Sequence, residues 1–193
     1  MRHALWLLCC LSFVVAIRAE VIDRIAAVVN GHIITASDMR QQREILATLG
    51  DKPIEDEATL LQHMIDDYLI ETNMTDVSVD VTDDEIEAEV RKFSPSTSLP
   101  LGKVRDAIRL RIRMRKYFDK HWGISIEPTD ADVRRYYQNV FVPAAREGGL
   151  TSIPPLEGIA ESIRKNVFQE TLNHEINIWL EAIRRKSNIE VFK

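Results

Sequence analysis

The first strand-like hydrophobic pattern of the chain is a β-branched run interrupted by a turn signal. Valine and isoleucine residues lie on both sides of Asn30-Gly31. Asn-Gly between two apolar runs is a strong hairpin signal, because both turn positions must tolerate positive φ. Residues 21–35 are therefore predicted to form two short antiparallel strands.

After the hairpin, apolar residues recur at the three- and four-residue spacing of helices. Three of the predicted helix starts carry a threonine with an acidic residue three positions later, the pattern of a capping box. Gly50-Asp51 is a helix stop after the first of these helices. The stripes and stop signals predict helices over residues 36–49, 55–75, 82–93, 129–141 and 159–183.

Residues 101–122 have two competing patterns. Their arginines alternate with apolar residues, which is the period of a strand, whereas Val104, Ile108 and Ile112 recur every four residues, which is typical of a helix. Because the segment exceeds twenty residues without a turn signal, its length favours a helix with two basic flanks.

The end of the chain, residues 188–192, returns to short β character. Since a lone exposed strand is unstable, we expect it to pair with the N-terminal hairpin. Residues 94–100 and 147–155 are rich in proline, glycine or polar residues and are predicted to be loops. The predicted fold is mainly α, with several helices and a small hairpin that pairs with a C-terminal strand.

The extreme N-terminus has the pattern of a cleavable export signal, predicted as residues 1–19. Basic Arg2 is followed by an apolar run over residues 4–17 and by the small residue Ala19. That run is shorter than the roughly 20 residues that span a bilayer. We therefore expect an exported protein without stable membrane insertion.

Export also bears on the cysteines and the charge. Both cysteines, Cys9 and Cys10, lie within the predicted signal, so the mature chain must fold on its hydrophobic core alone. The whole chain has a formal net charge of −5, and loss of the signal makes it more acidic.

The basic residues of segment 101–122 could bind nucleic acid. Ion pairing within the domain is the favoured interpretation, and no nucleic-acid partner is expected.

The sequence carries little catalytic chemistry. The four histidines of the mature chain are not at metal-ligand spacing, and no nucleophile elbow or phosphate-binding glycine loop is present. No catalytic residue, metal or cofactor is therefore expected. Several aromatic residues and a methionine are either core residues or the lining of an apolar groove for an extended peptide. These candidates are Met114, Tyr117, Phe118, Tyr136, Tyr137 and Phe141.

Several segments taken together resemble one protein family. Residues 21–39, VIDRIAAVVNGHIITASDM, resemble the N-terminal region of the SurA-type periplasmic chaperones. Further segments resemble the later parts of that domain in the family's order. They are ATLLQHMIDDYLIET (58–72), VSVDVTDDEIEAEV (77–90), IEPTDADVRRYY (126–137) and the closing segment 163–192.

The resemblance implies the peptide-binding fold shared by trigger factor and the SurA-type proteins. Members usually carry parvulin-type prolyl isomerase modules before the closing helix, where this chain has only residues 143–155. After the predicted signal (1–19), the resemblance implies one chaperone domain (20–193), formed by an N-terminal segment, residues 20–146, and a closing helix and strand, residues 155–193.

The function implied is ATP-independent holding of unfolded outer-membrane or secreted proteins in the periplasm. A prolyl isomerase and a non-catalytic assembly scaffold remain as alternatives. A homodimer is among the assemblies that the sequence allows.

Overall fold

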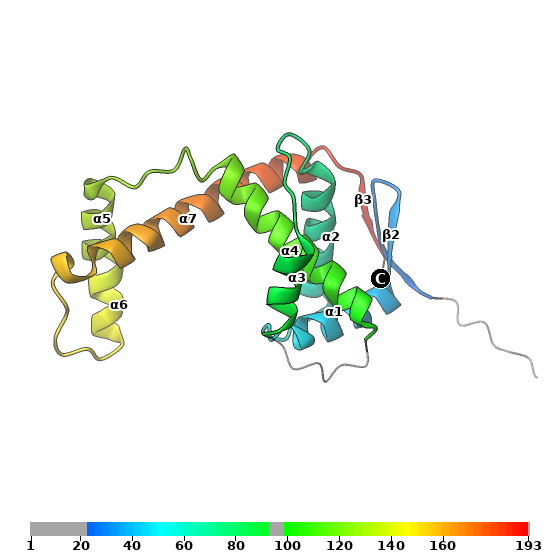
Figure 1. The fold of residues 1–193 in the computed structure, drawn as a ribbon, viewed down its shortest axis with the longest axis horizontal. Coiled ribbons are helices and arrows are strands. Elements are labelled where there is room, and N and C mark those ends of the chain that lie inside the picture. The colour runs from blue at the N-terminus through cyan, green and yellow to red at the C-terminus, as the bar shows by residue number, and fades with distance from the viewer. Residues whose placement is uncertain (1–22, 93–98, 193) are drawn as a thin grey trace, which may run out of the picture.

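The computed structural model describes residues 23–92 and 99–192. The predicted signal, residues 1–19, lies outside the described residues, as do residues 94–98 of the predicted loop. The described chain is mainly α-helical, with a three-stranded antiparallel sheet at one end (Figure 1). The predicted fold class is confirmed.

The N-terminal hairpin forms where the sequence predicts it. Strands β1 (Ile25–Val29) and β2 (His32–Thr35) pair antiparallel across a two-residue turn. Asn30 has a φ of 50° and Gly31 a φ of 86°. Both residues are thus in the left-handed region that a tight hairpin of this kind requires.

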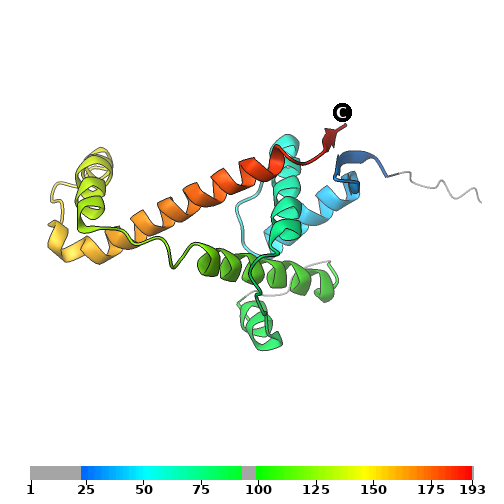
Figure 2. The same cartoon turned by 90° about the horizontal axis from the view of Figure 1, so that it is seen from above.

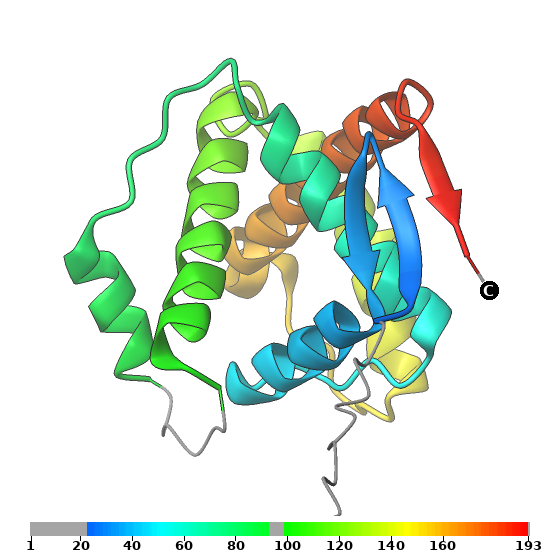
Figure 3. The same cartoon turned by 90° about the vertical axis from the view of Figure 1, so that its right-hand side faces the viewer.

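The two ends of the described chain meet in the sheet. Strand β3 (Ile189–Val191) pairs antiparallel with β1, which lies between β2 and β3 (Figure 3). Asn30 N donates to Asn188 O at 2.8 Å, and Phe192 N donates to Ala26 O at 2.9 Å. The predicted pairing of the C-terminal segment with the hairpin is confirmed.

The sheet packs with helices from the first two thirds of the chain to form a unit that we call the body. Thr35 and Thr82 each form the predicted capping box, in which the threonine and an acidic side chain three residues later bond each other's backbone. The helices are α1 (Ala36–Thr48), α2 (Glu57–Asn73), α3 (Asp83–Val90) and α4 (Leu101–His121).

Helix α4 resolves the ambiguity of residues 101–122. The positions at four-residue spacing, Val104, Ile108 and Ile112, are all buried. The basic flanks of α4 face acidic residues: Arg105 pairs with Glu87, and Lys116 Nζ lies 2.6 Å from Oε2 of Glu85. Both glutamates belong to α3, so the predicted ion pairing within the domain is confirmed.

Two clusters of buried apolar side chains hold the body together. The larger joins the sheet, α1, α2 and the C-terminal end of the last helix, and includes the fully buried Leu60, Leu69 and Val29. The smaller lies between α1, α3 and α4. Its buried members are Ile45, Leu49, Ile86, Val104, Ile108 and Ile112.

The last helix, α7 (Leu156–Arg184), extends from the body to a second, smaller unit (Figures 1 and 2). We call this unit the distal lobe. It contains α5 (Asp130–Tyr136), α6 (Val142–Glu147) and the N-terminal half of α7. Val133, Ala145 and Ile163 are its buried residues and belong to neither body cluster. α7 therefore joins two separately packed units.

The predicted helix 129–141 forms, but it is not regular throughout. Thr129 caps α5 through the predicted capping box with Asp132. A π-helical turn, η1 (Tyr137–Phe141), then follows, and the chain continues as α6. Residues 148–155 connect α6 to α7.

Candidate polypeptide-binding groove

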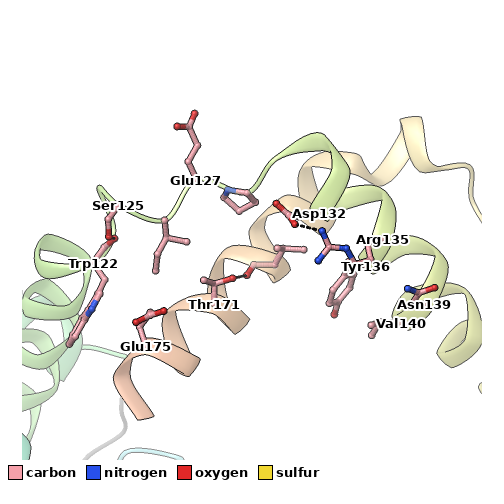
Figure 4. A pocket seen from close by; sticks show the side chains of 13 residues that line it. Trp122, Ser125, Glu127, Asp132, Arg135, Tyr136, Asn139, Val140, Thr171 and Glu175 are labelled. Atoms are coloured by element: carbon pink, nitrogen blue, oxygen red, sulfur yellow. Dashed lines mark hydrogen bonds and ion pairs between the residues drawn. The ribbon is translucent and has the colours of Figure 1, made fainter. Parts of the chain in front are cut away.

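A groove of about 770 Å³ lies between the body and the distal lobe. Its walls are the linker that follows α4, the start of the distal lobe and the middle of α7 (Figure 4). Its apolar lining consists of Trp122, Ile126, Pro128, Tyr136, Val140 and Val167. The polar lining consists of Ser125, Glu127, Asp132, Arg135, Asn139, Thr171 and Glu175.

The linker between α4 and α5, residues 122–129, forms one wall of the groove and begins with a tight turn at the end of α4. Ile126 N donates to Trp122 O at 3.1 Å, and Ser125 Oγ donates to the same oxygen at 2.8 Å. A Cβ at Gly123 would overlap the carbonyl oxygen of Asp119, so the turn requires glycine. The chain then passes Ile124, which is 89% exposed, before α5 begins.

An aromatic cluster fixes the body end of the groove. The ring of Trp122 lies 5.8 Å from that of Phe118 and 5.7 Å from that of Trp179 on α7. Tyr117 lies 6.0 Å from Trp179. These separations are typical of favourable aromatic packing. The cluster therefore joins α4 to α7 and holds Trp122 at the groove.

Tyr117 and Phe118, both predicted as candidate binding residues, belong to this cluster. Tyr117 is 1% exposed, and its hydroxyl donates to Asp76 Oδ1 at 2.5 Å. Burial, together with this contact, raises the pKa of Tyr117. Phe118 is partly buried beneath Trp122 and packs against the larger body cluster. Tyr117 and Phe118 therefore pack against the body core and Trp122, and neither lines the groove.

The aromatic candidates of the distal lobe lie in two places. Tyr136 lines the groove, where burial raises the pKa of its hydroxyl and the carboxylate of Glu170 adds to that effect. Tyr137 instead donates its hydroxyl to Pro154 O at 2.9 Å and stacks on Phe141 at 5.8 Å. Tyr137 and Phe141 therefore pack the lobe against the segment that precedes α7.

Met114, the remaining candidate, lies in a second groove of about 640 Å³ between α1, α2 and α4. Met64 and Tyr68 also line this groove, and the ring of Tyr68 stacks on His32 at 4.3 Å. His63 at its rim lies 3.1 Å from Asp67, and this hydrogen bond raises the pKa of His63. The six candidates are thus divided among two grooves, the aromatic cluster and the lobe interior.

The charges of the first groove are unequally distributed. At the lobe end, Arg135 pairs with Asp132 at 2.9 Å. The side chain of Glu175, on α7, makes no ion pair or hydrogen bond within residues 23–92 and 99–192. The groove therefore combines apolar walls with one neutralised pair and, within these described residues, two unpaired carboxylates, Glu175 and Glu127, of which Glu127 points away from Glu175 in Figure 4. Such a lining suits a segment with both apolar and polar side chains.

The sequence did not single out most of the groove's lining. Val140 and Val167 fit the apolar stripes of their helices, which indicate core positions, yet Val140 is 44% exposed. Trp122 is the last residue of the predicted helix 101–122 and follows the end of α4, and Ile126 lies beyond that predicted helix. One signal was available: Trp122 and Ile126 are apolar residues at and after the end of one predicted helix and before the capping residue Thr129 of the next, where core packing within a helix does not account for them.

Within the residues that the structure describes, no group of three or more histidine, cysteine, aspartate or glutamate side chains could hold a metal ion. None of the described helices is both long and apolar enough to cross a membrane.

Comparison with protein-family models and with curated proteins found no match to this chain.

Proposed function

We propose that this protein is an ATP-independent periplasmic chaperone that holds unfolded polypeptides, chiefly outer-membrane proteins, in the groove between the body and the distal lobe. The observation that carries the proposal is the groove itself, which is open to solvent and lined by both apolar and polar side chains. The ordered resemblance to the SurA-type chaperones and the predicted export signal supply the compartment and the class of client.

The lining matches the chemistry of such clients. A strand of an outer-membrane barrel alternates apolar and polar side chains along its length. Tyr136, Val140 and Val167 offer apolar contacts, while Asn139 and Thr171 offer hydrogen-bonding groups to polar side chains or to the backbone. An extended client segment could therefore satisfy both kinds of side chain in the same groove.

The size of the groove accounts for release without ATP. Burial of one valine- to phenylalanine-sized side chain contributes about 1.5–3 kcal/mol. A groove of this volume accepts only a few such side chains, and ordering of the client segment opposes binding. The resulting affinity is modest, so the client dissociates spontaneously and can fold elsewhere.

Suppression of aggregation tests this function. A urea-unfolded outer-membrane barrel protein is diluted into buffer that contains the processed protein and no ATP, and light scattering is followed. We expect suppression at near-stoichiometric ratios. Val140→Glu places a charge on the apolar wall and should require about tenfold more protein for equal suppression.

The matched control is Leu150→Glu, which changes an apolar residue of similar exposure (51%) outside the groove. Its suppression curve should overlay that of the unaltered protein. If the folded, unaltered protein leaves scattering unchanged, the chaperone proposal is wrong, and a scaffold for a folded partner becomes the better interpretation.

A further inference from the structure

Trp122 and Glu175 both line the body end of the groove although they come from different elements. Trp122 follows the last residue of α4, and Glu175 lies in the middle of α7 (Figure 4). Trp179, whose ring is 5.7 Å from that of Trp122, is four residues beyond Glu175. Residues four apart share a helix face, one turn from each other. Glu175 thus lies one helical turn from Trp179, whose ring packs on that of Trp122.

Trp122 and Glu175 are both partly buried and both line the groove, so a ligand there could contact either side chain. Phe118 and Trp179 pack against Trp122 and restrict its ring, yet Trp122 still lines the groove. Glu175 is partly buried and has no ion-pair partner within the described residues. A partly desolvated carboxylate without a cation gains more from binding one than a fully exposed carboxylate does.

The pairing of an indole with a carboxylate favours a guanidinium in particular. Arginine stacks on aromatic faces and forms two parallel hydrogen bonds with a carboxylate, whereas lysine acts as a compact, strongly hydrated charge. The groove's own arginine, Arg135, is already paired with Asp132 at the lobe end. It therefore does not compete for Glu175 in this arrangement.

We propose that the Trp122–Glu175 end of the groove is a subsite for an arginine side chain of the bound polypeptide. This proposal rests on the proposed chaperone function and adds a substrate preference to it. The preferred segment carries an arginine at the body end and an apolar or aromatic side chain against Tyr136 and Val140. Segments with an acidic residue in place of the arginine are disfavoured, because Glu175 repels them.

The test compares extended fluorescein-labelled peptides of one sequence, rich in aromatic residues, that differ at a single position. That position is arginine, its neutral isostere citrulline, or lysine. Binding to the processed protein is measured by fluorescence anisotropy. We expect the arginine peptide to bind about tenfold more tightly than the citrulline peptide and also more tightly than the lysine peptide.

Glu175→Gln should abolish the difference between the arginine and citrulline peptides while the protein remains folded. Glu157→Gln, which changes an exposed carboxylate of α7 outside the groove, should preserve it. Equal affinities for arginine and citrulline in the unaltered protein would overturn the subsite but leave the chaperone function standing. If no peptide of the set binds and aggregation is not suppressed, the proposed function itself fails.

Discussion

Replacement of Ile163 by alanine is expected to unfold the distal lobe and leave the body folded. Ile163 is 1% exposed on α7 and is the largest of the lobe's three buried apolar side chains, beside Val133 and Ala145. Truncation of a buried isoleucine to alanine costs about 2–5 kcal/mol. That cost is large for so small a core, whereas neither cluster of the body contains Ile163.

Hydrogen exchange followed by mass spectrometry measures the effect separately in each unit. Peptides from residues 130–147 should lose protection in Ile163→Ala, while those from α2 should keep it. The control is Ile178→Ala, which truncates an exposed residue of the same helix and should change stability by less than about 0.5 kcal/mol. Loss of protection in both units together would show that they unfold as one, contrary to this prediction.

Deletion of residues 188–193 is expected to lower the free energy of unfolding of the body by about 2–4 kcal/mol. The deletion removes β3 and its pairing with β1, together with the flanking hydrogen bond from Asn30 N to Asn188 O. It also removes Ile189, which packs on the larger body cluster, and uncovers the fully buried Val29. β1 then becomes an exposed edge with unpaired backbone groups.

Urea unfolding monitored by circular dichroism measures this change. Glu190→Gln keeps the β3 backbone and alters only an exposed side chain, so its midpoint should match that of the unaltered protein. An unchanged midpoint in the deletion variant would mean that the strand contributes nothing to stability. The closing of the sheet by both chain ends would then be incidental.

Local chemistry explains why so much of the fold could be predicted. Asn30-Gly31 fixes the hairpin because few other pairs tolerate positive φ at both positions. Thr35, Thr82 and Thr129 define three helix starts, because each bonds the backbone three residues later. These signals depend on neighbours in the sequence, so they can be read without the tertiary structure.

The features that escaped prediction depend on contacts between distant residues. The apolar stripe of residues 129–141 fits a regular helix, yet Tyr137–Phe141 forms a π turn. The stripe of α7 is continuous, so it does not reveal that its two ends pack against different units. The division into body and distal lobe is thus a tertiary property.

The groove was only partly predictable for the same reason. Tyr136 lines the groove, but residue type could not separate it from Tyr117, which has the same chemistry and lies in the core. Trp122 and Glu175 are far apart in sequence, and they line the same groove only because α7 packs against the end of α4. Burial and proximity of this kind require the folded structure.

Site-specific photo-crosslinking tests the central claim, that the groove holds the unfolded client, most directly. Benzoylphenylalanine is placed at Val140 or Thr171 inside the groove, or at Leu150 or Lys165 outside its lining. A urea-unfolded outer-membrane barrel protein is then diluted onto each variant and irradiated. We predict strong crosslinks from positions 140 and 171 and weak ones from 150 and 165. Equal yields at all four positions, or crosslinks only from the two outside positions, would contradict the account.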